Sequence, residues 1–360
     1  MSKYDVARRF QIGNKMPRLI FLNRFFFPDQ SATSQILSDL AFHLAERGFD
    51  VHVVTSRQLY ESPKARLPAQ ETVRGVTIHR VFSTRFGRTS LAGRAFDYLS
   101  YYAAVASKII RVASRDDVII AKTDPPLISV LAMWAARIRG AKLVNWLQDI
   151  YPEIAIETGV PLIKGPIGRI LSLLRDASLK AAVANVAVGR QMANRLISQG
   201  AKSDTIHVIP NWCDDEAIVP VANADNPLRQ KWGLQHKFVV GYSGNLGRGH
   251  EFNTLLASAE RFRGDPDVMF VLIGGGQRFE QLKRLVAEKG LDTIFRFFPY
   301  QDRDRLKHSL AVADMHWISL QAGLEDLMFP QQILRHCGRR PANSCGDRRN
   351  GRDREPRERI

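Results

Sequence analysis

The 360-residue chain has little cysteine and no long apolar run, and each shortage excludes a class of protein. Three scattered cysteines provide neither a disulfide framework nor the spacing of a metal site, so we expect a reducing compartment. A membrane-spanning helix needs roughly 18 to 20 uncharged apolar residues, and the apolar run at residues 125–136 is shorter and ends at Arg137. Residues 1–15 lack the apolar core of a signal peptide, and we interpret them as a disordered leader or as the product of a start codon upstream of Met16.

The motifs of several enzyme classes are also missing. The nine histidines show no zinc-ligand spacing, and no G-x-S-x-G nucleophile elbow occurs. Gly-rich loops are present, but they match neither the P-loop nor the G-x-G-x-x-G dinucleotide fingerprint. We therefore expect no metal and no bound cofactor.

Acidic residues are outnumbered by basic ones. The net charge is +16, and the 30 residues after Pro330 carry +5 of it. Such an excess suits anionic partners, which include nucleotide diphosphates, lipid phosphates, a membrane surface and nucleic acid, although it also serves plain solubility. No nucleic-acid-binding module accompanies the charge, so nucleic acid is not an expected partner.

What the chain does contain is a regular alternation of strand-length apolar runs and helical segments. The first run, residues 18–28, closes at Pro28, and the helical spacing that follows it ends at Gly48, as a glycine after a helix should. Further strands are predicted at residues 51–56, 76–82, 117–122, 142–149 and 185–189, with a helix at 126–140. This alternation predicts right-handed βαβ units on a parallel sheet, which is an α/β fold.

The pattern restarts after the polar stretch of residues 213–233. Strands are predicted at 237–244, 268–276, 294–300 and 315–320, with helices at 251–264, 278–290 and 302–313. We therefore divide the chain into the leader, an N-terminal domain of residues 16–215, a C-terminal domain of residues 216–330 and a tail of residues 331–360. A site is expected at the carboxyl ends of the strands, in a cleft between two doubly wound domains.

Two glycine-rich loops follow predicted strands of the second domain. The loop of residues 242–252 combines three glycines with Arg248 and leads into a helix. Backbone N–H groups, a helix N-terminus and a fixed cation suit a phosphate, although a plain turn has a similar sequence. Residues 274–276 are three glycines at the next strand end, where they either leave room for a ligand or form a tightly packed turn.

Polar residues also follow strands of the first domain. Ser31, Thr33 and Ser34 lie between the first strand and the first helix, where they can cap the helix, contact a substrate, or do both. Asp149 follows a buried strand and lies in a polar cluster with Glu153. A carboxylate there suits a general base or an acceptor for sugar hydroxyls, and the alternative is that Asp149 caps a helix while Glu153 is solvated.

The segment of residues 83–115 interleaves basic residues with five aromatic ones: Phe86, Phe96, Tyr98, Tyr101 and Tyr102. A basic, aromatic helix can lie on an anionic bilayer. An ordinary amphipathic helix packed on the sheet has the same composition, so the sequence leaves both interpretations open.

Several ordered segments resemble bacterial glycosyltransferase family 4, and more narrowly its branch that builds O-antigen, capsule and colanic-acid polysaccharides. They are residues 26–56, 147–153, 208–214 and 242–256. The resemblance implies the GT-B fold, in which two Rossmann-like domains face each other across a cleft. It also implies retaining transfer of a sugar from a nucleotide-sugar donor without a catalytic metal. Acceptors in the family are often polyprenyl-diphosphate-linked sugars, which implies a cytoplasmic protein, peripheral at the inner face of the plasma membrane.

The same resemblance implies roles for residues at matching positions. Arg248 would stabilise the leaving nucleotide, and Asp149 would face the reacting centre. The other members of the implied site are the donor-binding Ser243, Gly244, Asn245, Gly247, Gly275 and Gly276, and the acceptor-binding Ser31, Thr33 and Ser34.

After Pro330 the chain departs from the family pattern. A reading frame shifted by one base allows a peptide that begins with Ser, Lys, Phe and Tyr, as the family has directly after this proline. We therefore expect a frameshift at Pro330–Gln331, which leaves the second domain truncated and the Arg-rich tail disordered. The alternatives to an active glycosyltransferase are a truncated product that at most binds donor, and a sugar-nucleotide epimerase on the same fold.

Overall fold

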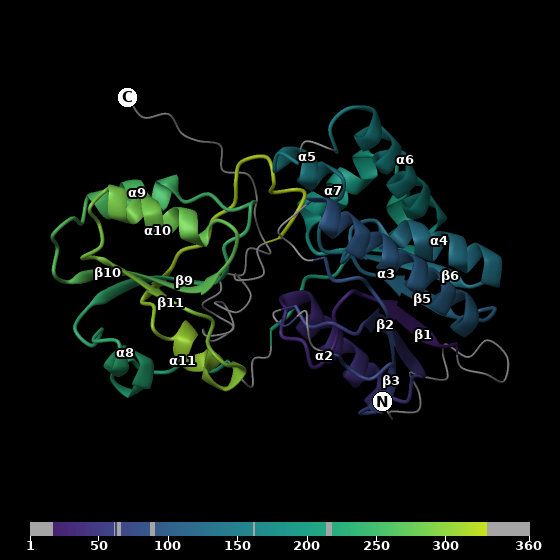
Figure 1. Ribbon diagram of the computed structural model, residues 1–360, viewed down its shortest axis with the longest axis horizontal. Coiled ribbons are helices and arrows are strands. Elements are labelled where there is room, and N and C mark those ends of the chain that lie inside the picture. Colours follow the sequence, from purple (N-terminus) through teal and green to yellow (C-terminus); the bar gives the residue numbers. More distant parts are fainter. Residues whose placement is uncertain are drawn as a thin grey trace. The chain divides into compact units, whose positions relative to one another are not determined.

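The computed structural model describes residues 17–60, 62, 66–86, 91–160, 163–213 and 218–329. Within these residues the chain forms two compact units (Figure 1). Unit 1 consists of the chain up to Asn211 together with Ala322–Phe329, and unit 2 consists of Trp212–Gln321. The interpreted leader, the predicted frameshift at Pro330–Gln331 and the tail lie outside the described residues.

Unit 1 is built on an eight-stranded sheet with the strand order β3-β4-β2-β1-β5-β6-β7-β8. Neighbouring strands are parallel, except that β3 at the edge runs antiparallel to β4. The strands are β1 (Leu19–Leu22), β2 (Val51–Ser56), β3 (Gln70–Val73), β4 (Val76–Val81), β5 (Val118–Ala121), β6 (Lys142–Leu147), β7 (Ala184–Ala187) and β8 (Ile206–Val208). The predicted parallel sheet is therefore confirmed, with one antiparallel edge strand added.

Helices cover both faces of this sheet (Figure 1). They are α2 (Ala32–Glu46), α3 (Leu91–Val112), α4 (Ile128–Arg139), α5 (Glu153–Glu157), α6 (Pro166–Ala181) and α7 (Arg190–Ser198), with a 3-10 turn at Ser203–Thr205. Successive side chains of β2 point to opposite faces of the sheet. Val54 joins the core formed with α3 and α4, and Val53 is buried on the other face. Gly48 follows α2 with φ 88°, which confirms the predicted end of that helix.

Unit 2 has four parallel strands in the order β11-β10-β9-β12. They are β9 (Phe238–Asn245), β10 (Val268–Gly275), β11 (Phe295–Phe298) and β12 (Met315–His316). The helices are α8 (Pro227–Lys231), α9 (Asn253–Glu260), α10 (Phe279–Glu288) and α11 (Leu306–Leu310), with 3-10 turns at Asn223–Asp225 and Arg303–Arg305. Along β10, Phe270 and Leu272 face the core under α9 and α10, whereas Val271 and Ile273 face a second core. Burial on both faces explains why this strand is apolar throughout.

Two strands are shorter than their apolar runs predict. The run of residues 18–28 forms a strand only to Leu22, and Phe25 and Phe26 are buried in the loop that follows. The run of residues 315–320 pairs in the sheet only at Met315 and His316. In both places apolar side chains fill the core from a loop, so hydrophobicity alone overestimates the strand.

Candidate active site

The strand order of unit 1 reverses between β1 and β5. The chain goes from β1 to β2 on one side and reaches β5 on the other, and the crevice at the carboxyl ends of two such strands is where open α/β sheets bind ligands. Arg24 follows β1, Lys122 follows β5 and Asp149 follows β6. The topology thus gathers ionisable side chains at one edge of the unit.

Lys122 is buried at this edge, with 1% of its surface exposed. Its Nζ donates a hydrogen bond of 3.0 Å to the carbonyl oxygen of Thr33 and lies 4.2 Å from the centre of the Trp146 ring. Burial lowers the pKa of Lys122 to about 7, although the carboxylates of Asp124 and Asp149 favour its charged form. Lys122 therefore ties the start of α2 to β5 and can change protonation near neutral pH.

Asp149 is half-buried, and its carboxyl group makes no hydrogen bond to any described residue. Burial raises its pKa to about 6, the charge of Asp124 adds to this, and Lys122 opposes it. Pro152 is the N-cap of α5, and no side chain caps that helix, so Asp149 is not a capping residue. A carboxyl group in this state is suited to exchange a proton with a hydroxyl group.

The loop before α2 is held by Asp29. Ser31 is the N-cap residue of α2, but its hydroxyl donates to the Asp29 carboxylate instead of accepting a helix N–H bond. Ser34 is buried and donates to the Asp29 carbonyl oxygen at 3.1 Å. Thr33, in the first turn of α2, accepts the hydrogen bond of Lys122, and Lys122 in turn interacts electrostatically with Asp149.

Glu153 is part of a structural ion-pair network and is not solvated. Arg175 of α6 donates two hydrogen bonds to its carboxylate, at 2.9 and 2.7 Å, and Gln199 donates a third at 2.9 Å. Bidentate pairs of this kind are strong and directional, so the network fixes α5 on α6. Glu153 is thereby occupied, whereas Asp149 is not.

Unit 2 has its own reversal of strand order, between β9 and β12. The loop after β9 is tied to the segment after β12, because Glu251 N–H donates to Ser319 Oγ at 3.2 Å and Gln321 N–H donates to the Gly249 carbonyl oxygen at 2.8 Å. His250 is buried and donates from Nδ1 to the Ser319 carbonyl oxygen at 2.9 Å. Burial lowers the pKa of His250, the bond to Ser319 opposes this, and the charge of Arg278 lowers it further.

The two glycine-rich loops of unit 2 pack against each other. Gly244 pairs with Gly274 across β9 and β10, and a Cβ at Gly274 would lie 2.1 Å from the Gly244 carbonyl oxygen. A Cβ at Gly276 would lie 2.5 Å from the carbonyl oxygen of Leu246. Both glycines also have positive φ, 136° and 123°. The tightly packed turn therefore accounts for Gly274 and Gly276 without any ligand.

Arg248 connects these loops, because its Nε donates to Gln277 Oε1 at 2.8 Å. The register pairs Asn245 with Gly275, and Gly247 follows in the same loop. Unit 2 therefore gathers at one edge every residue predicted to bind donor: Ser243, Gly244, Asn245, Gly247, Gly275 and Gly276, together with Arg248. Arg248 is half-buried, so its side chain is partly accessible to solvent.

Helix α3 packs one face on the sheet and exposes apolar side chains on another. Tyr101 is buried and donates to the carbonyl oxygen of Asn23 at 3.1 Å, so one face of the helix packs on the sheet. Phe96 and Leu99 are exposed on its other face. The guanidinium of Arg24 lies 5.0 Å from the centre of the Tyr98 ring.

Lys122 and His250 are candidate site residues that the sequence analysis did not single out. Lys122 ends an apolar, strand-length run, and a lysine in such a position is costly to bury unless it has a partner or a task. That signal was available in the sequence. His250 follows Arg248 closely, but a lone histidine in a loop carries no comparable signal.

Two protein families match the chain in sequence. The family described as "Glycosyl transferase 4-like domain" matches residues 32–212, which is half of the chain, and "Glycosyl transferases group 1" matches residues 225–322. The putative colanic acid biosynthesis glycosyl transferase WcaI of Escherichia coli K12 is 28% identical over 204 residues, covering 55% of this chain and 49% of that protein. The probable glycosyltransferase WbjE of Pseudomonas aeruginosa is 25% identical over 226 residues, covering 62% and 56%. The chain thus spans about half the length of these curated relatives.

Solved structures show the same fold at low identity. Anabaena Alr3699/HepE in complex with UDP and glucose has a TM-score of 0.63 at 18% identity, covering 89% of this chain and 78% of that one. An α,α-trehalose-phosphate synthase (UDP-forming) from Burkholderia vietnamiensis has a TM-score of 0.65 at 15% identity, covering 90% and 82%. These likenesses confirm the expected GT-B fold class with its Rossmann-like domains.

Proposed function

Because this chain belongs to the glycosyl transferase 4-like family, we propose that it transfers a sugar from a nucleotide-sugar donor to a glycan acceptor in surface polysaccharide synthesis. The transfer proceeds with retention at the anomeric carbon, and the acceptor sugar is carried on a polyprenyl diphosphate. The relative in Escherichia coli is described as a putative colanic acid biosynthesis enzyme, which supports the polysaccharide role. UDP, present in the Anabaena structure, is the first nucleotide to test.

The observation that carries this proposal is the edge of unit 2, where Arg248 and two glycine-rich loops lie at the reversal of strand order. When the bond between the sugar and the diphosphate breaks, negative charge develops on the departing diphosphate. Arg248 and the N–H groups of its loop are positioned to stabilise that charge, an effect that enzymes often use as their largest electrostatic contribution.

Unit 1 holds the acceptor in this proposal. A hydroxyl of the acceptor forms the new bond to the sugar and must lose its proton. Asp149, with its pKa near 6 and no hydrogen-bond partner among the described residues, is suited to accept that hydroxyl's hydrogen bond or proton. Ser31, Thr33 and Ser34 border the same edge through the contact of Thr33 with Lys122.

A test of the donor site measures UDP affinity by titration calorimetry. Arg248→Ala should weaken UDP binding tenfold or more, since a charge-assisted hydrogen bond to a phosphate is lost. Arg261→Ala removes an exposed arginine elsewhere on unit 2 and serves as the matched control. Equal affinities for Arg248→Ala and the parent chain would contradict the donor site.

Further outcomes separate the alternatives. UDP binding without sugar transfer to any acceptor would favour the truncated, inactive product. Conversion of UDP-glucose in the absence of an acceptor would favour an epimerase. The frameshift at Pro330–Gln331 remains a prediction, and an independent reading of the coding DNA there tests it.

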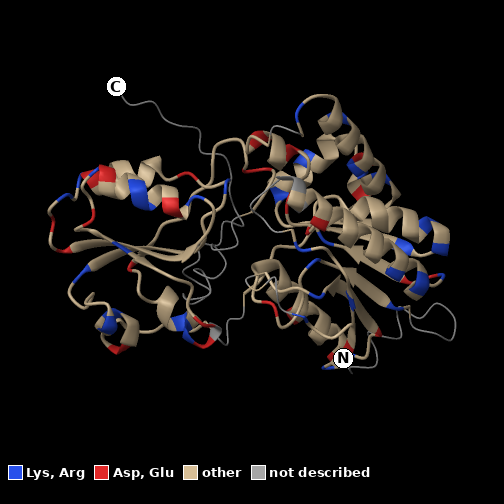
Figure 2. Cartoon of the chain, in the orientation of Figure 1, with Lys and Arg blue, Asp and Glu red and all other residues tan. Residues whose placement is uncertain are grey.

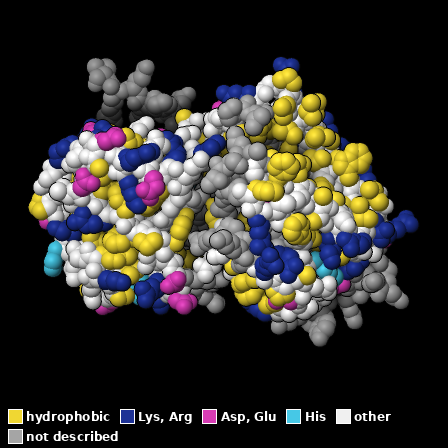
Figure 3. All heavy atoms as spheres, in the orientation of Figure 1, with side chains coloured by type: hydrophobic (Ala, Val, Ile, Leu, Met, Phe, Trp, Pro, Cys, Tyr) yellow, Lys and Arg dark blue, Asp and Glu magenta, His cyan; other side chains and the backbone are white. Residues whose placement is uncertain are grey.

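We further propose that unit 1 associates with an anionic membrane surface through α4 and α6. Among the described residues, no helix is long and apolar enough to cross a bilayer. Helix α6, however, turns large aliphatic side chains outward, and Leu173 is 68% exposed. The exposed apolar residues of the two helices are Trp134, Ile138, Ile167, Ile170, Leu173 and Leu174. Figure 3 shows hydrophobic side chains gathered on the part of the surface over α4 and α6.

The charges around this face suit acidic lipids. Exposed basic residues on or beside the two helices are Lys164, Arg169, Lys180, Arg137 and Arg139. Figure 2 shows basic positions in blue on these helices. The acidic residue within them, Asp176, is paired with Arg175. An apolar face edged by cations binds the interface of an anionic bilayer in two ways: its apolar side chains enter the acyl boundary, and its cations attract the acidic headgroups.

Sedimentation with vesicles tests this surface. Leu173→Asp should reduce binding to phosphatidylglycerol-containing vesicles, while Leu99→Asp on α3, an equally exposed leucine, should not. The reverse result would move the membrane surface to α3, as the aromatic sequence of that helix first indicated.

A further inference from the structure

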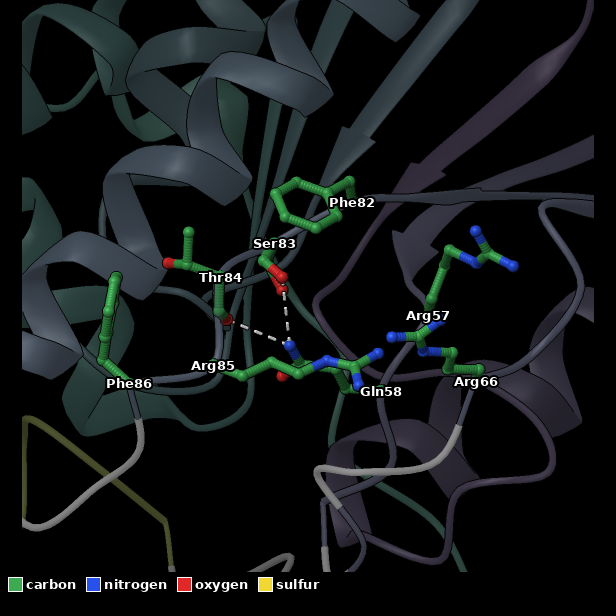
Figure 4. Close-up of a pocket in the computed structure, with 8 residues that line it drawn as sticks. All are labelled: Arg57, Gln58, Arg66, Phe82, Ser83, Thr84, Arg85 and Phe86. Atoms are coloured by element: carbon green, nitrogen blue, oxygen red, sulfur yellow. Dashed lines mark hydrogen bonds between the residues drawn. The ribbon is translucent and has the colours of Figure 1, made fainter.

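Unit 1 contains a pocket of about 500 Å³ at the ends of β2 and β4 (Figure 4). It lies between the loop that follows β2, with Arg57 and Gln58, and the loop that follows β4, residues 82–86. Because β2 and β4 are parallel neighbours in the sheet that contains β1, the pocket opens at the same carboxyl edge as the loop before α2. A volume of this size is ordinary for a small-molecule site.

Buried polar groups hold the walls of this pocket in place. Gln58 is buried, and its Nε2 donates to the carbonyl oxygens of Ser83 and Thr84 at 3.4 and 3.1 Å, so it connects the two loops (Figure 4). Behind the second loop, the buried Asp97 accepts the hydroxyl of Thr84 at 2.8 Å and the N–H of Phe86 at 3.0 Å. These bonds join the two loops to each other and connect the second loop to α3.

The charged residues of the described lining are basic. Arg57, Arg66 and Arg85 line the pocket, and no acidic residue is among the lining residues that the structure describes. Arg57 donates from Nε to the carbonyl oxygen of Leu67 at 2.9 Å, and its terminal nitrogens make no hydrogen bond to a described residue. Three guanidinium groups around one hollow attract an anion, and a diphosphate satisfies more of their donors than a single carboxylate does.

Two aromatic side chains beside the arginines favour a ligand that also has an apolar part. Phe82 and Phe86 line the pocket and are exposed by 66% and 65%. Large apolar side chains so exposed beside a charged hollow are typical of ligand sites. A ligand that fits both features carries an anionic group and an apolar part next to it.

We propose that this pocket binds the phosphate or diphosphate of an ester whose organic part is apolar, with the anion among the three arginines and the organic part against Phe82 and Phe86. This assignment rests on the proposed function. In that function, the pocket binds the anionic end of a lipid-linked acceptor on unit 1. The donor binds to unit 2, so the two sites can be titrated independently.

Calorimetric titration of the full chain with three probes tests the ligand class. Farnesyl diphosphate should bind at least tenfold more tightly than inorganic pyrophosphate, and farnesol should show no binding. Equal affinity for pyrophosphate and farnesyl diphosphate would overturn the apolar part of the proposal. If farnesol binds with the same affinity as farnesyl diphosphate, the anionic part of the proposal is overturned. If farnesyl diphosphate does not bind, the whole proposal is overturned.

Substitutions locate the site. Arg66→Ala and Arg57→Ala should each weaken farnesyl diphosphate binding about tenfold or more, as expected for the loss of a charge-assisted contact. Arg47→Ala removes an exposed arginine after α2 and should change the affinity by less than about twofold. Equal losses in all three would show nonspecific attraction and overturn the site. Because Arg66 is exposed and makes no hydrogen bond to a described residue, its substitution keeps the test free of folding effects.

Titration with UDP separates this inference from the proposed function. Arg66→Ala should leave UDP affinity unchanged. A chain that binds farnesyl diphosphate but not UDP would retain the pocket and refute the donor site. If the parent chain binds UDP but Arg57→Ala and Arg66→Ala leave farnesyl diphosphate affinity unchanged, the pocket is contradicted and the donor site is not.

Discussion

Unit 1 places ionisable side chains at its reversal of strand order, whereas unit 2 places glycines and backbone there. In unit 1, Lys122 and Asp149 have pKa values near 7 and 6 because they are withdrawn from water. In unit 2, the corresponding edge consists of two interlocked glycine loops joined by Arg248. The same topology thus gives two kinds of candidate site: one in unit 1 whose charge varies near neutral pH, and one in unit 2 whose arginine keeps a fixed charge.

This difference matches what the two proposed substrates require. A nucleotide diphosphate remains anionic throughout the physiological range, and a permanent cation with oriented N–H groups is enough for it. An acceptor hydroxyl must lose a proton, which requires a group able to change protonation at ambient pH. We therefore expect the pH dependence of the protein to originate in unit 1.

The largest expected effect is the pH dependence of stability caused by Lys122. Between about pH 7 and the ordinary lysine pKa of 10.5, the unfolded chain holds a proton on Lys122 that the folded chain has released. The free energy of unfolding should therefore rise with pH in this window, by about 1.4 kcal/mol per pH unit from this residue. Lys122→Met should lose this rise in denaturant titrations at pH 7, 8 and 9.

Lys142→Met is the matched control for that measurement, since Lys142 is exposed at the start of β6. It should keep the slope of the parent chain. Identical slopes for Lys122→Met and the parent would show that folded Lys122 remains charged, and the contrast between the two units would lose its main support.

The next effect concerns the glycine packing of unit 2. Gly274→Ala should destabilise the chain by about 3 kcal/mol, because the new Cβ would meet the Gly244 backbone and the residue has positive φ. Gly247→Ala should cost less than about 1 kcal/mol, since its Cβ would meet only Asn245 Nδ2, at 3.7 Å. Denaturant unfolding measures both. If Gly274→Ala were no worse than Gly247→Ala, the packed turn would not explain the glycine.

The smallest effect should come from Arg248. Its side chain makes one hydrogen bond to a described residue, the exposed bond to Gln277, so Arg248→Ala should change the free energy of unfolding by less than about 0.5 kcal/mol while it weakens UDP binding. The same unfolding experiment checks this. A loss of several kcal/mol would mean that Arg248 holds the loops together, and its effect on UDP would then be structural.

Local pattern was enough to predict the parallel sheets, most strand positions and the strand-end location of Asp149. Each of these depends on periodicity and on short connections that a sequence displays directly. The residues 274–276 show the limit of such evidence. Glycine permits close approach to a ligand and close approach to another loop equally well. Only the register of β9 with β10 shows that these glycines pack against the neighbouring loop.

Other features depended on contacts between distant parts of the chain. The sequence analysis left Glu153 open as a solvated residue because its partner Arg175 lies in α6, which no local pattern connects to it. Helix α6 itself buries Arg175 and Ser178 while it exposes Leu173, which reverses the usual pattern of a surface helix. No prediction was made for residues 166–181, and the apolar residues of this helix do not mark its buried face.

The return of Ala322–Phe329 to unit 1 has a consequence for the order of folding during synthesis. These residues pair with the strand end of β6, through Ile150 N–H to the Leu327 carbonyl oxygen at 2.8 Å, and they bury Leu324 and Leu327. A ribosome makes them only after residues 212–321 of unit 2. The neighbourhood of Asp149 therefore stays incomplete until that part of unit 2 has been synthesised.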